Sequence, residues 1–211
     1  MDLITARHIR KNFGVKTLLE DVNIIIHEGD KIGLVGVNGS GKSTLLKILA
    51  GALDDEGGEI VRANELRCSY LPQNPECDPA LCVLDQMKAF LKSDVEDYEC
   101  RSLLGKLGLT DMDALVGTLS GGQRKKIALA AVLAEDANLL ILDEPTAVLT
   151  EKEAEALLDS IRHMSEKGIA VIFITHRLHE ILSVCSKVVV MRDGLVVKDC
   201  PASETDVTDI T

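Results

Sequence analysis

A glycine-rich segment that ends in a lysine and two hydroxyl residues is the part of the sequence best equipped for chemistry. The segment Gly36-Val37-Asn38-Gly39-Ser40-Gly41-Lys42-Ser43-Thr44 fits the pattern G-x-x-x-x-G-K-[ST]. It lies between a short apolar run and a helical pattern, as a phosphate-binding loop requires. Its glycines let backbone N–H groups point at phosphate oxygens, and the helix start adds positive potential. The alternative is a glycine-rich turn with an exposed lysine.

The polar side chains of this phosphate-binding loop (residues 36–44) have distinct expected roles. We expect Lys42 to reach the β- and γ-phosphates, Ser43 to ligate Mg²⁺ and Thr44 to donate to the α-phosphate region. The expected phosphate-binding residues are Gly36, Asn38, Gly39, Ser40, Gly41, Lys42, Ser43 and Thr44.

Two carboxylates follow an apolar run later in the chain. Leu139 to Leu142 reads as a buried strand, and Asp143 and Glu144 come directly after it. If this strand lies beside the strand of the phosphate-binding loop, Asp143 is near the metal and Glu144 is near the γ-phosphate, where it can polarise an attacking water. Strands often end in acids, so the indication comes from the pairing with the phosphate-binding loop.

A third motif, Leu119-Ser120-Gly121-Gly122-Gln123, has the composition of a helix start that binds an anion. Ser120 can cap the helix, and Gln123 stands three residues later, as in a capping box. The glycines at 121 and 122 leave their backbone N–H groups accessible. The alternative is an ordinary capped helix from Gln123 to about Leu133.

Composition narrows the class of protein. The chain has 211 residues, which favours one domain, and its net charge of −11 argues against a broad nucleic-acid-binding surface. It has no apolar run long enough to cross a bilayer and no signal-peptide layout at its start, so we expect a cytoplasmic protein. Cys77 and Cys82 stand five apart without a nearby histidine, which argues against a metal site.

Hydrophobic patterning predicts strands that alternate with helices. The first thirty residues read as short strands, and residues from about 74 to 137 read as mostly helical. Strand and helix alternation implies a parallel α/β core, with the helical stretch inserted beside it. The remaining expected strands are 31–36, 59–61, 66–71, 139–142, 169–175 and a hairpin over 187–197, and the expected helices lie at about 42–50 and 154–164.

Together the three motifs resemble the nucleotide-binding domain of ATP-binding cassette (ABC) proteins, over nearly the whole chain. Leu119 to Gln123, LSGGQ, is the signature that separates this family from other ATPases with a phosphate-binding loop. The resemblance implies a P-loop NTPase (RecA-like) parallel sheet core, an N-terminal antiparallel β part and a helical insertion, all in one domain over 1–211. It also implies ATP and Mg²⁺ as cofactors and ATP hydrolysis as the activity.

The resemblance assigns further residues by position. Phe13 matches the aromatic that stacks on adenine, although a core phenylalanine is the alternative. Gln73 matches the glutamine that senses Mg²⁺ and links the core to the helical insertion. His176 matches the histidine that touches the γ-phosphate and orients Glu144. The resemblance thus implies Lys42, Gln73, Glu144 and His176 as catalytic residues and Ser43, Gln73 and Asp143 as metal residues, and it adds Ser120, Gly121, Gly122 and Gln123 to the nucleotide-binding set.

The resemblance also implies partners. In this family the signature segment closes over the nucleotide held by a second cassette, so we expect a homodimer, and docking on transmembrane subunits through the helical insertion. Membrane association is then only through that partner. One departure is Thr150, which stands where the family usually has an aspartate that contacts the partner. Thr150 and Glu153 form a plausible capping box, so the change affects communication between sites rather than structure.

The two halves of the chain resemble different relatives. Residues 1 to about 145, with SYLPQNPECDP and VGTLSGGQRKKIALAAVL, are similar to soluble F-type cassettes that act on ribosomes. The remainder, with EPTAVLTEKE and FITHRLHEI, is similar to sugar and nucleoside importer ATPases. A crossover near 143–146 suggests a recombined or engineered chain, with natural divergence as the alternative. Three functions follow: a transporter ATPase, a ribosome-associated cassette that lacks its usual second cassette and basic linker, and an isolated cassette that binds ATP without a partner.

Overall fold

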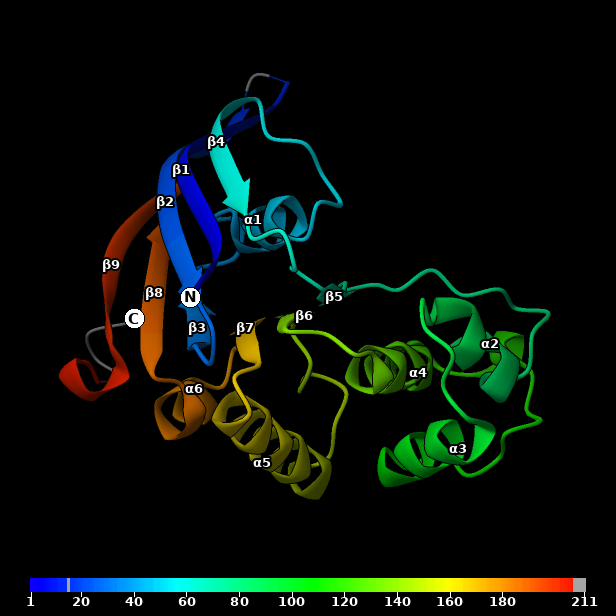
Figure 1. Cartoon of the computed structure of the whole chain (residues 1–211). Helices are drawn as coiled ribbons and strands as arrows, with labels where there is room; N and C mark the ends of the chain where they lie inside the picture. Colours follow the sequence, from blue (N-terminus) through cyan, green and yellow to red (C-terminus); the bar gives the residue numbers. More distant parts are fainter. Residues whose placement is uncertain (15, 207–211) are drawn as a thin grey trace.

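The computed structural model describes residues 1–14 and 16–206, which form two β-sheets and the helices around them (Figure 1). One sheet has three strands in the order β2-β1-β4, and the other has six in the order β5-β6-β7-β3-β8-β9. The strands are β1 (Asp2–Phe13), β2 (Lys16–His27), β3 (Lys31–Val35), β4 (Gly57–Arg62), β5 (Cys68–Leu71), β6 (Leu139–Asp143), β7 (Ala170–Ile174), β8 (Lys187–Arg192) and β9 (Leu195–Pro201).

The first thirty residues form long strands, and the prediction of short strands was wrong. β1 and β2 each run for 12 residues and pair antiparallel, and β4 pairs with the other edge of β1. His8 has a φ of 54°, and the register with β2 shifts between Ala6 and Ile9. Such a bulge adds a residue without ending the strand, so the regular alternation of apolar residues is broken in the sequence but the pairing continues.

The six-stranded sheet is parallel from β5 to β8 and ends in the antiparallel hairpin of β8 and β9. Its central strands are buried on both faces, as their apolar runs predict. On β6, Leu139 and Ile141 pack into the core that the sheet shares with β1 and β2, and Leu140 and Leu142 pack into the core on the opposite face. The sheet is therefore fixed from both sides.

Helices cover both faces of this sheet. α1 (Lys42–Leu49) lies between the two sheets and buries Leu45, Leu46 and Leu49 there. α5 (Glu151–Glu166) and α6 (Leu178–Val184) lie on the opposite face of the six-stranded sheet (Figure 1). This layering holds the start of α1 at the carboxyl end of β3.

The predicted helical stretch, which connects β5 to β6 in the chain, lies to one side of the sheet (Figure 1). It contains α2 (Val83–Phe90), α3 (Asp97–Lys106) and α4 (Gly121–Ala134). Residues 74–82 form no helix; Pro75 and Pro79 fall in this part. Across the described residues, no helix combines the length and the apolar character needed to span a membrane.

Candidate functional site

The carboxyl ends of β3, β5, β6 and β7 lie along one edge of the sheet, where ligands bind in open α/β folds. The loops that follow these strands surround a cleft of about 420 Å³. Most of the predicted site residues meet there, from four separate parts of the chain. The cleft is lined by Leu18, Asn38, Gly39, Gly41, Lys42, Ser43, Thr44, Gln73, Glu144 and His176.

Two glycines let the phosphate-binding loop pass close to the neighbouring backbone. Gly36 has a φ of 151°, and a Cβ on it would lie 2.1 Å from the carbonyl oxygen of Met191. Gly41 has a φ of 98°, and its Cβ would lie 2.6 Å from the carbonyl oxygen of Leu18. A side chain fits at neither position, so the tight curl of the loop depends on glycine.

Lys42 holds its ammonium group at the loop. Its Nζ donates to the carbonyl oxygens of Gly36 at 2.7 Å and Val37 at 2.9 Å. Burial lowers the pKa of Lys42, and the Glu144 and Asp143 carboxylates act in the opposite direction. The cation is thus held in a partly desolvated place next to the backbone N–H groups of the loop, which suits it to bind a phosphate.

Asp143 has the properties of a carboxylate that is available to bind a cation. Its side chain is fully buried, and neither carboxylate oxygen has a hydrogen-bond partner. Burial raises the pKa of Asp143, while the nearby Ser43 side chain and Lys125 ammonium act to lower it. Unpaired buried oxygens are costly, and carboxylate and hydroxyl oxygens are the ligands that Mg²⁺ prefers.

The protein groups near the loop can supply only some of the ligands of a Mg²⁺ ion. Among residues 1–14 and 16–206, no three His, Cys, Asp or Glu side chains gather closely enough to hold a metal. Mg²⁺ usually keeps several waters and takes its other ligands from one or two protein groups and the substrate phosphates. Ser43 and Asp143 are the two protein groups that would hold the ion in this way.

Glu144 and His176 form a pair at the edge of the cleft. The distance between Oε1 of Glu144 and Nε2 of His176 is 2.6 Å. Glu144 has a φ of 53°, which is uncommon for a residue with a side chain and costs on the order of 1–3 kcal/mol. This conformation turns the carboxylate out of the strand direction and toward His176, which comes from the loop after β7.

Sequence reasoning missed Lys125. This lysine of α4 is 4% exposed, and its Nζ donates to the carbonyl oxygen of Asp143 at 2.8 Å. Burial lowers the pKa of Lys125, against the effect of the Asp143 and Glu144 carboxylates. No one-sided apolar pattern marks Lys125 in the sequence, because the residues from 127 to 132 are all buried.

Gly36, Ser40 and Asp143 do not line the cleft although they belong to its loop and strand, and Phe13 and the signature segment lie apart from it. Phe13 is 58% exposed at the end of β1, so the alternative of a core phenylalanine is wrong, and adenine stacking stays a prediction. Ser120 and Gln123 form the predicted capping box at the start of α4: the Gln123 N–H donates to Ser120 Oγ at 3.2 Å, and the Ser120 N–H donates to Gln123 Oε1 at 2.9 Å. A Cβ on Gly121 would meet nothing within 4 Å.

Thr150 caps α5, as predicted. The Glu153 N–H donates to its hydroxyl, and the Thr150 N–H donates to Glu153 Oε2 at 2.9 Å. Both oxygens of Glu153 also accept from Lys126 Nζ of α4 at 2.8 Å. Although burial raises the pKa of Glu153, the contacts with Lys126 and Thr150 outweigh it and lower the pKa. The start of α5 is therefore tied to the helix that carries the signature.

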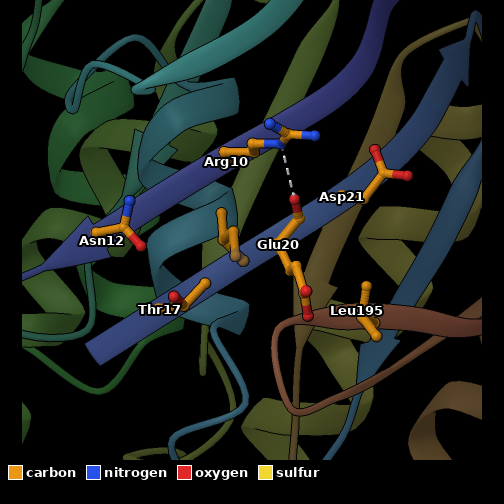
Figure 2. A pocket seen from close by; sticks show the side chains of 7 residues that line it. Arg10, Asn12, Thr17, Glu20, Asp21 and Leu195 are labelled. Atoms are coloured by element: carbon orange, nitrogen blue, oxygen red, sulfur yellow. Dashed lines mark hydrogen bonds between the residues drawn. The ribbon is translucent and has the colours of Figure 1, made fainter. Parts of the chain in front are cut away.

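A larger hollow of about 530 Å³ lies on β1 and β2 and brings no predicted site residue together (Figure 2). Arg10 spans it and donates from Nε to the carbonyl oxygen of Glu20 at 3.1 Å. The carboxylates of Glu20 and Asp21 also line it. With two carboxylates against the one guanidinium of Arg10, the charge of this hollow disfavours a phosphate ligand, and the smaller cleft is the candidate site.

The solved structures with this fold include ABC cassettes. The chain matches the structure of an ATP-binding subunit of an ABC transporter with a TM-score of 0.84 and 22% identity, over 96% of this chain and 91% of that one. It matches a dimeric bacterial ABC transporter cassette with a TM-score of 0.84 and 21% identity, over 95% and 99%. These likenesses establish the shared fold, an α/β cassette with an N-terminal antiparallel β part.

Curated relatives are named as import proteins. The chain is 34% identical to the ribose import ATP-binding protein RbsA of Lactococcus lactis subsp. cremoris and 36% identical to that of Chromobacterium violaceum. Each match covers 98% of this chain and 46% of the relative, so the chain spans about half the length of these relatives.

The same import proteins match both halves of the chain, on either side of residues 143–146. The interpretation as a recombined chain with a crossover near 143–146 is therefore not supported. A family model described as ABC transporter matches residues 19–147, which is more than half of the chain. With the phosphate-binding loop, the carboxylates of Asp143 and Glu144 at the end of β6 and the capped LSGGQ helix in place, this chain belongs to the ABC transporter family.

Proposed function

We propose that the chain binds Mg-ATP in the cleft beside α1 and hydrolyses it. The observation that carries this proposal is the convergence of Lys42, Glu144 and His176 on one cleft from three distant segments. A lysine in a glycine-rich loop binds phosphates, and a carboxylate paired with a histidine can accept a proton from water.

Each group has a separate task in the proposed reaction. The loop N–H groups and Lys42 bind and orient the phosphates, and Ser43 and Asp143 would hold Mg²⁺. When bound, Mg²⁺ supplies positive charge against the phosphate oxygens. Glu144 polarises the attacking water, and His176 keeps the Glu144 carboxylate aimed at it through their 2.6 Å contact. Gln73 lines the same cleft from the segment after β5.

The signature segment points to a second cassette. Ser120, Gly121 and Gly122 start α4 outside the cleft that Lys42 lines, yet the capped helix start presents accessible N–H groups. We therefore propose that two copies of the chain face each other, so that each signature segment meets the nucleotide held by the other copy. The dimeric cassette among the structural matches supports this arrangement.

A second groove, of about 640 Å³, fits a docking partner. It lies between the end of α1, the segment after β5 and α4, and its floor includes Phe90, Ala128 and Val132. The buried hydroxyl of Tyr70, which lines it, has no hydrogen-bond partner. We propose that a transmembrane subunit of a sugar importer occupies this groove, in line with the names of the relatives.

The cell fraction that contains the chain distinguishes a membrane-protein partner from a ribosome. We expect the tagged chain to sediment with membranes and to be released by detergent, because the groove would hold it on a membrane protein. Cell fractionation followed by immunoblotting measures this. Recovery with ribosomes instead, sensitive to EDTA but not to detergent, would favour the ribosome-acting alternative.

Removal of Mg²⁺ tests the hydrolytic proposal. Purified chain with ATP and Mg²⁺ is expected to release phosphate, and excess EDTA is expected to abolish release, because Asp143 and Ser43 then lack the cation that they hold against the phosphates. A coupled phosphate assay measures the rate. Release that persists without Mg²⁺ would contradict the assignment of these residues.

A further inference from the structure

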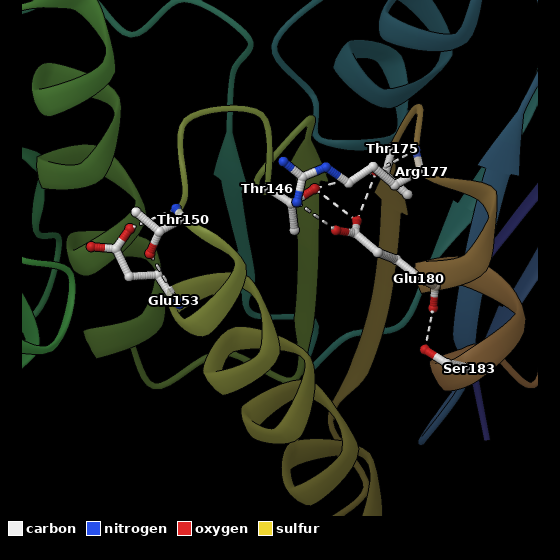
Figure 3. Close-up of polar contacts among 7 residues, drawn as sticks. All are labelled: Thr146, Thr150, Glu153, Thr175, Arg177, Glu180 and Ser183. Atoms are coloured by element: carbon white, nitrogen blue, oxygen red, sulfur yellow. Dashed lines mark hydrogen bonds and ion pairs between the residues drawn. The ribbon is translucent and has the colours of Figure 1, made fainter.

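A buried carboxylate lies directly behind the Glu144 and His176 pair. Glu180, in the first turn of α6, is 2% exposed. Its Oε2 accepts from the hydroxyl of Thr146 at 2.8 Å and from the hydroxyl of Thr175 at 2.8 Å. Its Oε1 accepts from Arg177 at 3.2 Å. Figure 3 shows these side chains converging on one carboxylate.

The partners of Glu180 belong to the two loops that carry the pair. Thr146 follows Glu144 by two residues, in the turn after β6, and Thr175 directly precedes His176, after β7. The two hydroxyl oxygens lie 3.2 Å apart, so Glu180 joins the loops at one point. The loop that carries Glu144 and the loop that carries His176 are thus both hydrogen-bonded to the Glu180 side chain.

His176 is held on both sides. Thr175 before it donates to Glu180 through its hydroxyl, and Arg177 after it donates to Glu180 through its guanidinium. The Arg177 N–H also donates to the Thr175 hydroxyl at 3.1 Å. The His176 ring is 54% exposed, so its position depends on this backbone support more than on packing around the ring.

A buried carboxylate is costly unless it is fully paired, and this one accepts from two hydroxyls and a guanidinium. We propose that Glu180 is a positioning residue for ATP hydrolysis: it joins the loop of Glu144 to the loop of His176 and so keeps that pair in contact. This inference rests on the proposed hydrolytic role of the pair. Glu180 acts through Thr146, Thr175 and Arg177 and not by contact with the nucleotide.

The test compares three variants with the parent chain. Glu180→Leu removes all three contacts, Glu180→Gln keeps a carbonyl oxygen for the threonines, and Ser183→Ala is the matched control. Ser183 donates to the backbone carbonyl of Glu180 at 2.9 Å and not to its carboxylate. The Ser183→Ala substitution therefore removes a hydrogen bond within α6 and leaves the contacts of the Glu180 carboxylate intact.

The expected kinetic result is a change in kcat alone. Glu180→Leu should lower kcat by roughly 10- to 100-fold while KM and the Kd for ATP stay near the parent values, because misplacement of a reacting group costs about that much. Glu180→Gln should recover most of the loss, and Ser183→Ala should match the parent. A parent-like kcat in Glu180→Leu would overturn the proposal.

A second readout does not depend on activity. In chain labelled with ¹⁵N-histidine, the ring nitrogens of His176 in Glu180→Leu should shift toward their position in Glu144→Ala, in which the pair is broken. Unchanged shifts would overturn the positioning role. A parent that lacks ATPase activity would instead count against the proposed function, and the spectra would still decide the role of Glu180.

If Glu180→Leu fails to fold, Thr175→Val takes its place in both measurements. This variant removes one of the two hydroxyls that donate to Glu180, so the same direction of change is expected.

Discussion

Lys42→Ala is expected to weaken ATP binding about 10- to 100-fold. The ammonium is already held at the phosphate-binding loop by the carbonyl oxygens of Gly36 and Val37, so it pays little entropy to meet a phosphate. The loss of a charge-assisted contact costs about 1.5–3 kcal/mol, which corresponds to that change in Kd. Titration with a fluorescent ATP analogue measures it.

The control for this variant is Lys152→Ala. Lys152 is exposed in the first turn of α5, so the control makes the same change in net charge away from the cleft. Its Kd should equal that of the parent, and both variants should melt at temperatures near the parent value. Equal affinity of Lys42→Ala and parent would show that the loop does not bind the phosphates.

Glu144→Gln is expected to lower the rate of ATP hydrolysis by about 10²- to 10⁴-fold, the range typical of a removed general base. The amide keeps the size of the side chain and its hydrogen bond to His176, but it is not a base. The Kd for ATP should stay within a few-fold of the parent, because Glu144 is not among the groups that bind the phosphates. Single-turnover assays with radiolabelled ATP separate the two effects.

Glu151→Gln serves as the matched control. Glu151 is exposed at the start of α5, so its substitution makes the same charge change on the surface. Unchanged turnover in Glu144→Gln would remove Glu144 from the reaction and leave the pair with His176 as a structural contact.

Local patterns in the sequence predicted the elements that position the site. The phosphate-binding loop, the apolar strand before Asp143 and the capping boxes of Ser120 and Thr150 all depend on neighbours within a few residues, and the structure confirms the strand and both caps. The length of β1 was not predictable in this way, because the bulge at His8 hides the pattern of a single strand.

Long-range contacts escaped prediction for a physical reason. Lys125 and Glu180 are charged residues on helices, where a charge ordinarily faces solvent. Each meets a polar partner from another part of the chain: the carbonyl oxygen of Asp143 at the end of β6 for Lys125, and the hydroxyl of Thr146 for Glu180. Which loops come together depends on the order of strands in the sheet, and the local sequence does not encode that order. The pairing of Glu144 with His176 was likewise implied only by resemblance.

The mass of the Glu144→Gln variant with and without Mg-ATP shows whether two copies of the chain close around the nucleotide. If two copies close around ATP and the nucleotide persists, light scattering should give a monomer without ATP and twice that mass with it. Glu144→Gln/Gly121→Glu should stay monomeric, because a carboxylate in the open space at the signature repels the phosphates while the Ser120 cap remains. A monomer mass for Glu144→Gln at saturating Mg-ATP would contradict a site completed by a second copy of this chain.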